Sequence, residues 1–518
     1  MNAVLFQWPL YFFAASTRAN FDTNAALAVT TLFVFQLVIS ITLLGLCALI
    51  SIRLLKSLCA LFTFGNAFAL YFIVQYKVII DSTMVGNVLS TSFSEAFDLA
   101  HPKLFLYVIV LGVLPALVLW RVRIAGGTRA RRLGIVLLSL VLGSAWMYAN
   151  AQNWLWIDRN AKAFGGLILP WSYVINTVRY YKSESERHRV AEPLPALSRA
   201  DSGGVIVVLV IGEAARAQNF SLFGYARDTN PLLVTDKVVA YPGAHSCATY
   251  TTASLRCMLS YKGAKGITSN DEPLPSYLYR HGVEVIWRTN NFGEPPLKVS
   301  RYETADQIRK TCKQDCARLQ YDEVLLYGLE PLLHQGNDNT KTLIILHQGG
   351  SHGPQYAKKY PPAFEKFRPT CQSVELQKCT KAELVSAYDN TIVYTDNVLH
   401  QVIQLLRSVA RPAVMLYMSD HGESLGENGL YLHGLPIAFA PEAQSAVPLL
   451  LWMSDEFVRR GGGARVPSSI PHTPSHDIVF HSVMGAMGLR SPIYAPEHDL
   501  FKITQPTKNG VAGNEHGK

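Results

Sequence analysis

The chain has 518 residues, which is enough for two or three domains. Only 16% of its residues are charged and its mean hydropathy is +0.14, values that argue against a purely soluble protein. The net charge of +9 does not indicate nucleic-acid binding, because the basic residues lie in short clusters between apolar segments. We interpret these clusters as membrane topology signals and expect no nucleic-acid partner.

Apolar segments fill the first third of the chain. Met1–Ser16 is apolar and aromatic, but as a helix it would span only about 24 Å, short of the ~30 Å hydrocarbon core of a bilayer. We expect a partial first helix or the remnant of a longer one, retained as an anchor, because no small-residue cleavage site follows it. Clear membrane-spanning candidates follow at about Ala25–Ile50, Leu58–Tyr76, Leu104–Trp120 and Leu133–Tyr148.

Basic residues in two connecting loops predict the membrane topology. Arg53 and Lys56 lie between the second and third apolar segments, and a group of arginines lies between the fourth and fifth: Arg121, Arg123, Arg129, Arg131 and Arg132. By the positive-inside rule both loops are cytoplasmic, so the chain after Tyr148 is extracytoplasmic. Ala161–Tyr181 is predicted to be a helix on the membrane surface, and the polar segment Lys182–Gly204 to be a linker.

The cysteines fall into two groups. Cys47 and Cys59 lie in apolar segments, where we interpret them as small hydrophobic residues. The other six are close in sequence in pairs: Cys247 with Cys257, Cys312 with Cys316, and Cys371 with Cys379. The even count and close spacing predict disulfides in an oxidising compartment. Zinc thiolates are the alternative, but these cysteines lack the regular Cys-x-x-Cys repeats that would support them.

After the linker, short apolar runs alternate with helical or loop segments. The runs predicted as buried strands are Val205–Ile211, Val283–Trp287, Thr342–Leu346, Ala413–Met418 and Leu449–Trp452. This alternation predicts an α/β domain with a mainly parallel central sheet flanked by helices. The final segment, from Thr504 to Lys518, is polar and glycine-bearing and is predicted to be a disordered tail.

Potential metal ligands follow three of these strands. Glu213 follows the first, His347 the third, and Asp420 and His421 the fourth. Open α/β sheets hold ligands at the carboxyl ends of their strands, so carboxylates and imidazoles there indicate a metal site. The alternatives are a carboxylate at a helix N-terminus for Glu213, and a capped turn with a solvated histidine for Asp420 and His421.

The segment Cys247–Cys257 places several hydroxyl groups inside one predicted disulfide loop. A threonine is a poor nucleophile at neutral pH unless a base or a metal lowers the pKa of its hydroxyl. Zinc held by Glu213, Asp420 and His421 would have that effect and would also bear the charge of a phosphoryl group. Hydroxyls that cap a helix are the alternative, and the segment alone does not choose among Thr249, Thr251 and Thr252.

Several motifs occur together in the part of the chain predicted to be extracytoplasmic. They are Gly212-Glu213-Ala214-Ala215-Arg216, Phe223-Gly224-Tyr225, the threonine-bearing segment between the two cysteines above, Ser351-His352-Gly353-Pro354, Tyr388-Asp389-Asn390-Thr391, and Ser419-Asp420-His421-Gly422-Glu423 through His433. Together they resemble the phosphoethanolamine transferases, inner-membrane enzymes of the alkaline-phosphatase superfamily that include the lipid A-modifying and mobile colistin-resistance enzymes. The resemblance runs from the first apolar segment to about residue 500.

The resemblance implies roles for individual residues. Thr251, four residues after Cys247, would be the nucleophile, and the zinc ligands would be Glu213, Thr251, Asp420 and His421. His352 and His433 would bind the phosphoethanolamine phosphate and assist proton transfer. The resemblance also implies that Glu423 holds a second metal, that Lys298 contacts the phosphate, and that Asn87 and Glu95 contact the donor lipid. The cofactor would be one Zn²⁺, or two.

The sequence departs from the family at three points. The first apolar segment looks truncated, Ala248 stands where many relatives have glycine, and the loop between Cys312 and Cys316 is short. None of these departures removes an implied ligand.

The implied organisation is a transmembrane domain over residues 1–160, an interfacial helix and linker over 161–204, a sulfatase-like periplasmic catalytic domain over 205–503, and a tail over 504–518. The resemblance implies a monomer in the Gram-negative inner membrane. It would transfer phosphoethanolamine from phosphatidylethanolamine to lipid A through a threonine intermediate, and so confer resistance to polymyxin-like peptides.

Other functions remain open at this stage. One alternative is that the acceptor is a core or Kdo sugar. Another is that the chain is a metal-dependent phosphodiesterase or a glycerol-phosphate transferase of the same superfamily. A sulfatase is disfavoured because the nucleophile segment has no Cys-x-Pro-x-Arg sequence. A catalytically inert membrane protein that binds lipid or peptide through the same fold is the alternative from another class.

Overall fold

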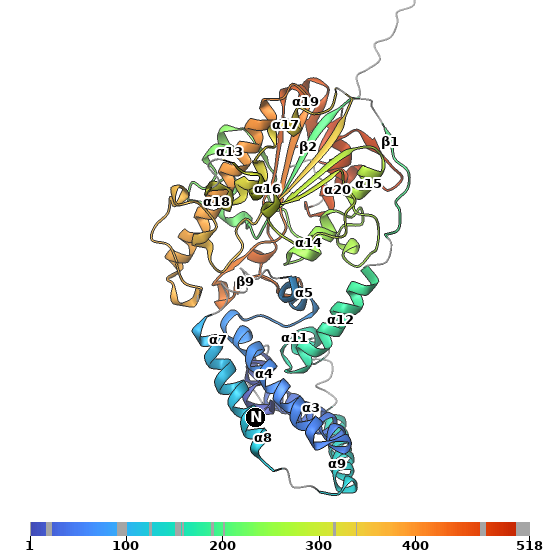
Figure 1. The fold of residues 1–518 in the computed structure, drawn as a ribbon, viewed down its shortest axis with the longest axis vertical. Coiled ribbons are helices and arrows are strands. Elements are labelled where there is room, and N and C mark those ends of the chain that lie inside the picture. The colour runs from blue at the N-terminus through green and yellow to red at the C-terminus, as the bar shows by residue number, and fades with distance from the viewer. Residues whose placement is uncertain are drawn as a thin grey trace, which may run out of the picture. The chain divides into compact units, whose positions relative to one another are not determined.

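The structure is a computed structural model that describes residues 2–16, 23–90, 101–123, 127–150, 157, 160–187, 191–199, 203–313, 317–337, 339–374, 376–466 and 473–503 (Figure 1). The chain forms two compact units. The first consists of Met1–Glu186 with Asn428–Gly434, and the second of Arg187–Glu427 with Leu435–Lys518. The predicted disordered tail and the predicted lipid contact Glu95 lie outside the described residues.

Long apolar helices dominate the first unit. Among the described residues, four helices are long and apolar enough to cross a membrane: Ala26–Ile50, Ile52–Tyr76, Pro102–Arg121 and Arg129–Ala149. They confirm the four predicted spans. They correspond to α3 (Thr23–Ile50), α4 (Ile52–Tyr76), α7 (Pro102–Tyr107) continuing through a π-helical turn into α8 (Leu114–Arg121), and α9 (Arg129–Ala149). Shorter elements are α1 (Asn2–Leu5), α2 (Trp8–Ser16), α5 (Ser82–Ser90) and β9 (Tyr431–Leu432).

Glycine permits a close approach of α9 to α3. A Cβ at Gly143 of α9 would lie 2.4 Å from Cγ2 of Val38 on α3, far inside van der Waals contact. Small residues are the usual means by which membrane helices pack closely.

The predicted surface helix Ala161–Tyr181 is wrong as one continuous element. The structure has α11 (Ala161–Leu167) and α12 (Trp171–Arg187), with Pro170 between them. Proline has no backbone N–H and clashes with the preceding turn, so it separates the two helices.

The second unit is built on a sheet of seven strands in the order β3-β10-β7-β2-β6-β4-β5. Its strands are β2 (Val205–Gly212), β3 (Val239–Ala240), β4 (Glu284–Thr289), β5 (Arg301–Thr304), β6 (Lys341–His347), β7 (Ala413–Ser419) and β10 (Leu449–Met453). Parallel pairs join β7, β2, β6, β4 and β5, while β10 is antiparallel to both β7 and β3. The sheet is therefore mainly parallel, as predicted.

All five predicted strands are present, and the two that the sequence missed are at the edges. Every residue of β2 is buried, as its unbroken run of Val, Ile and Leu predicts for a central parallel strand. In contrast, β3 has only two residues and β5 begins with two exposed ones, Arg301 and Tyr302. Neither strand has the apolar run by which a buried strand is recognised.

Helices cover both faces of this sheet (Figure 1). One face packs against α14 (Thr251–Met258), α15 (Leu274–Arg280) and α20 (Asp477–Ala486), whose buried side chains share a core with alternate residues of β2, β4, β6, β7 and β10. The long helix α18 (Lys381–Arg407) lies on the opposite side. Smaller elements are α13 (Pro231–Thr235), α16 (Ala305–Thr311), α17 (Glu330–Leu333), α19 (Asp455–Arg459), β8 (Ser424–Leu425), and the antiparallel pairs β1 (Ser198–Arg199) with β12 (Leu489–Arg490) and β11 (Gly462–Ala464) with β13 (Phe501–Ile503).

Two of the predicted disulfides are formed in the second unit. Cys247 is bonded to Cys257, and Cys371 is bonded to Cys379. Cys316, the predicted partner of Cys312, lies outside the described residues. Cys47 and Cys59 are free thiols in the first unit.

The centre of β2 should be sensitive to loss of side-chain volume. Leu209 is fully buried and is flanked by Ile345 of β6 and Leu416 of β7, so we expect Leu209→Ala to lower the unfolding free energy by about 2–5 kcal/mol. Denaturation of the full chain in detergent, followed by near-ultraviolet circular dichroism, measures the change. Val458→Ala is the control, because this side chain is 50% exposed and should cost at most about 0.5 kcal/mol. Equal stability of the two variants would contradict this account of the core.

Candidate metal centre

The register of two neighbouring strands brings the central acidic and imidazole groups together. β2 and β7 are parallel, with Gly212 paired to Ser419, so Glu213 and the Asp420-His421 pair leave the sheet side by side. All three side chains are at most 1% exposed. A carboxylate oxygen from each acid and a ring nitrogen of His421 lie within 4.8 Å of one another.

The spacing of these atoms is close to that of ligands around one metal ion. His421 Nε2 lies 3.1 Å from Glu213 Oε1 and 3.4 Å from Asp420 Oδ2. Zinc bonds of about 2.0–2.2 Å at tetrahedral angles place neighbouring ligand atoms roughly 3.3–3.6 Å apart. Two carboxylates and one imidazole are also ligand types that Zn²⁺ accepts. The donor set and its spacing therefore suit zinc.

Local hydrogen bonds orient the two candidate ligands that follow β7. Asp420 Oδ1 accepts from the backbone N–H groups of Ala214 (3.1 Å) and His421 (2.7 Å), which leaves Oδ2 facing the cluster. His421 Nδ1 donates to the carbonyl of Gly422 at 2.8 Å, so its Nε2 is the nitrogen presented to a metal. These bonds hold the donor atoms in place without using them.

Burial of like charges is the dominant electrostatic feature. Burial raises the pKa of the Asp420 carboxyl well above its ordinary value, and the Glu213 carboxylate raises it further. Burial alone would lower the pKa of His421, but Asp420 and Glu213 outweigh it and raise that pKa to about 10. Both pKa values are raised because positive charge between the carboxylates is stabilising. A divalent cation would provide that charge in place of a proton.

The structure gives different partners to two of the three candidate hydroxyls, Thr251 and Thr249. Thr251 is the first residue of α14, and its Oγ1 donates to Glu213 Oε2 at 3.0 Å. Thr249 Oγ1 instead donates to the carbonyl of Leu435. Thr251 is therefore the hydroxyl that contacts the cluster, at a helix N-terminus where backbone N–H groups favour anions.

The segment after β6 forms another wall of the site. The N–H of Ser351 donates to the carbonyl of Glu213 at 2.9 Å, and Nδ1 of the next residue, His352, lies 2.8 Å from the carbonyl oxygen of Gly353. Asp322 accepts from the N–H groups of Gly349 (2.8 Å) and Gly350 (2.9 Å). Gly350 has a φ of +45°, and a Cβ there would lie 2.5 Å from the Glu213 carbonyl oxygen, so only glycine fits.

Asn291 is a site residue that the sequence analysis missed. Its Nδ2 donates to Glu213 Oε2 at 2.6 Å and to the carbonyl of Gln348 at 3.0 Å. Asn291 follows β4, so the rule that drew attention to the ends of the other strands would also have selected it. Its amide fixes the orientation of the Glu213 carboxylate.

The other predicted site residues have more varied positions. Glu423 is fully buried and accepts from the hydroxyl of Tyr356 at 2.7 Å. His347, at the end of β6, lies 3.3 Å from the hydroxyl of Thr289 through Nδ1. Lys298 is exposed, and its backbone N–H donates to Ser276.

Two predicted residues belong to the first unit. Asn87 lies in α5, although its side chain is not among the described groups, and His433 directly follows β9. Their roles stay predictions.

Two family models together match most of the chain. Residues 21–185 match the phosphoethanolamine transferase EptA/EptB family model, and residues 206–489 match the sulfatase family model. The second match begins one residue after the start of β2.

Individual relatives match almost the whole chain. It is 37% identical to phosphoethanolamine transferase EptA of Helicobacter pylori, over 96% of this chain and 94% of that protein. It is 35% identical to phosphatidylethanolamine transferase Mcr-1 of Escherichia coli, over 81% and 83%. The solved structure of the integral membrane protein lipooligosaccharide phosphoethanolamine transferase A from Neisseria meningitidis matches with a TM-score of 0.85 at 30% identity, over 96% of both chains.

These matches extend across both units. The protein is therefore a multi-pass protein of the Gram-negative inner membrane, with its sulfatase-like part in the periplasm. A relative of more than 30% identity that is matched over nearly its full length also identifies the family. The chain belongs to the phosphoethanolamine transferase family.

Proposed function

We propose that this protein transfers phosphoethanolamine from phosphatidylethanolamine to lipid A, with Zn²⁺ as cofactor and Thr251 as a covalent nucleophile. The observation that carries the proposal is the 3.0 Å contact between Thr251 Oγ1 and Glu213 Oε2, within the cluster that also contains Asp420 and His421. A hydroxyl positioned against a metal-binding set is the arrangement that nucleophilic catalysis by threonine requires.

The residues that would hold zinc are Glu213, Thr251, Asp420 and His421. Bound there, Zn²⁺ supplies Lewis-acid chemistry that lowers the pKa of the threonine hydroxyl and offsets negative charge on the phosphoryl group. The buried oxygen and nitrogen donors already have the spacing for it. Asn291 holds Glu213 in this orientation.

The reaction would proceed in two displacements. Thr251 gives its proton to solvent water, its oxygen attacks the phosphorus of phosphatidylethanolamine, and the bond from phosphorus to the diacylglycerol oxygen breaks. Diacylglycerol leaves with a proton donated by His352 or His433, and phosphoethanolamine remains esterified to Thr251. A phosphate hydroxyl of lipid A then gives its proton to the histidine that protonated diacylglycerol, and its oxygen attacks the same phosphorus. The threonine oxygen leaves and takes a proton from solvent water.

The N-terminus of α14 suits this chemistry. The first N–H groups of a helix have no intrahelical acceptor, and the helix dipole places partial positive charge there. Thr251 is the first residue of this eight-residue helix, so a phosphoryl group on its oxygen would lie beside those donors.

The first test concerns the nucleophile. We expect the full-length protein in detergent, incubated with zinc and phosphatidylethanolamine, to gain the mass of one phosphoethanolamine group, and Thr251→Ala to gain none. Thr252→Ala is the matched control, because it removes a neighbouring hydroxyl from the same helical turn and should keep the adduct. Intact mass spectrometry reads all three proteins, and an adduct on folded Thr251→Ala would refute the assignment.

The second test concerns the metal. Asp420→Asn removes one negative charge from the cluster, so we expect zinc binding at least about tenfold weaker, measured as zinc per protein at fixed free zinc. Asp396→Asn is the control. Asp396 is also buried, but it accepts from the N–H groups of Leu232 and Leu233, away from the cluster. Unchanged zinc content in Asp420→Asn would exclude Asp420 as a ligand.

The third test concerns the acceptor. Expression of the wild type in a Gram-negative host should add phosphoethanolamine to lipid A, and the added amine should raise polymyxin resistance because it reduces the negative surface charge. Thr251→Ala should do neither. Mass spectrometry of the lipopolysaccharide locates the group: modification of a core or Kdo sugar would replace lipid A as acceptor, and free phosphoethanolamine alone would indicate a hydrolase.

A further inference from the structure

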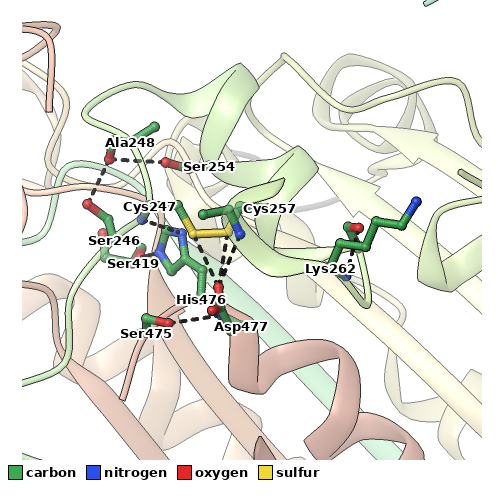
Figure 2. The surroundings of a disulfide bond; sticks show 12 residues. Ser246, Cys247, Ala248, Ser254, Cys257, Lys262, Ser419, Ser475, His476 and Asp477 are labelled. Carbon is green, nitrogen blue, oxygen red and sulfur yellow. Dashed lines mark hydrogen bonds between the residues drawn. A yellow bond between two sulfur atoms is a disulfide. The ribbon is translucent and has the colours of Figure 1, made fainter. Parts of the chain in front are cut away.

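A buried histidine lies beside the nucleophile segment and takes no part in the steps above. A ring nitrogen of His476 and the sulfurs of Cys247 and Cys257 lie within 4.8 Å of one another, a spacing that metal ligands also show (Figure 2). The two sulfurs are bonded to each other, so neither is available as a thiolate. The histidine must therefore be understood from its other contacts.

His476 bridges two backbone groups. The N–H of Cys247 donates to its Nδ1 at 3.4 Å, and its Nε2 lies 3.0 Å from the carbonyl oxygen of Ser419 (Figure 2). Burial lowers the pKa of His476 to about 4, so the ring is neutral at physiological pH and carries one proton. Because Nδ1 accepts, that proton is on Nε2, which donates to Ser419.

The two ends of this bridge lead to the two halves of the catalytic site. Ser419 is the last residue of β7 and directly precedes Asp420 and His421. Its own hydroxyl accepts from the N–H of Ala215, two residues beyond Glu213. Cys247 begins the segment that ends at Thr251. A single imidazole thus connects the strand that carries the metal ligands with the segment that carries the nucleophile.

The disulfide does not make this connection. It joins Cys247 to Cys257, which lies in α14, so it fixes the segment to its own helix. Ser246 and Ser254 act similarly, since both hydroxyls donate to the carbonyl of Ala248 (Figure 2). These bonds give the segment its shape, but not its place beside β7.

We propose that His476 is a positioning residue that holds the nucleophile segment in register with β7, so that Thr251 reaches Glu213. This inference rests on the proposed function, because it takes Thr251 to be the nucleophile. The hydroxyl contact that carries the proposal is only 3.0 Å long, and a displacement of about 1 Å at a reacting atom costs up to ~100-fold in rate.

The chain supplies a closely matched control in His481, which lies in α20, the helix that begins directly after His476. His481 is also buried, with its pKa lowered by burial to about 4. It also bridges two backbone groups: Ala495 N–H donates to its Nδ1 at 3.2 Å, and its Nε2 lies 3.3 Å from the carbonyl of Tyr261. Neither group belongs to the candidate site. Loss of either imidazole thus costs the fold similar contacts, but only His476 reaches the nucleophile segment.

The experiment compares His476→Phe, His476→Gln and His481→Phe with the wild type, as full-length proteins in detergent. We measure zinc per protein and melting temperature for each protein. We also measure the rate of phosphoethanolamine adduct formation, by rapid quench and intact mass, over a range of phosphatidylethanolamine concentrations. We expect His476→Phe to slow the maximal rate about tenfold to a hundredfold, with zinc content and half-saturating donor concentration unchanged. His476→Gln, which keeps one donor and one acceptor, should recover most of the rate, and His481→Phe should match the wild type.

Each other outcome has a definite meaning. Equal rates in His476→Phe and His481→Phe would overturn the positioning role. Complete loss of zinc from His476→Phe would also overturn it, because Glu213, Asp420 and His421 should keep the metal when only Thr251 is displaced. If His476→Phe does not fold, the positioning role is tested by comparing His476→Gln with His481→Phe. A folded His476→Gln as slow as Thr251→Ala would also overturn the positioning role. Absence of an adduct on the wild type would refute the proposed function itself, a result distinguishable from all of these.

Discussion

The parallel pairing of β2 with β7 is the interaction on which the candidate metal centre depends. Seven residue pairs, ending at Gly212 with Ser419, set the height at which the two strands leave the sheet. Glu213 therefore emerges opposite Asp420 and His421. Side chains alternate between faces along a strand, so a slip of one residue would send a ligand to the other face and separate it by about 3.3 Å. The buried core on one face of the sheet, which includes Val207 of β2 and Met418 of β7, opposes such a slip.

This register concentrates charge where water does not reach. Glu213 and Asp420 are at most 1% exposed, and burial of carboxylates costs several kcal/mol each unless a cation or hydrogen bonds compensate. Backbone N–H groups satisfy one oxygen of Asp420, and Asn291 satisfies one of Glu213. The other two oxygens, Glu213 Oε1 and Asp420 Oδ2, lie 3.1 Å and 3.4 Å from Nε2 of His421, where a cation would bind. The same features that make the site costly to fold thus favour a bound cation.

Much of this arrangement follows from local sequence. The membrane spans are long apolar helices, and the central strands are runs of Val, Ile and Leu, so each is recognisable without knowledge of its neighbours. Glu213, Asp420 and His421 were also predictable, because the ends of parallel strands meet at one edge of a sheet. The motif resemblance then separated Thr251 from the other two threonines, and the contact with Glu213 agrees with that choice.

The rest depends on contacts between distant parts of the chain. Cys247 and His476 are 229 residues apart, and Asn291 and Glu213 are 78 apart. A buried histidine has no local pattern that reveals its partner, so nothing near His476 in the sequence singled it out. Asn291 does have a local signal, its position after β4, but its contact with Glu213 depends on the fold. The edge strands β3 and β5 were missed for a different reason, since short strands with exposed residues show no apolar run.

The central claim is that oxygen and nitrogen ligands from two strand ends and a helix N-terminus hold the metal. X-ray absorption at the zinc edge of the full-length protein tests it most directly. The account predicts a first shell of oxygen and nitrogen at about 2.0–2.1 Å, without sulfur. A sulfur shell at about 2.3 Å would place the metal on cysteine and would contradict the assignment.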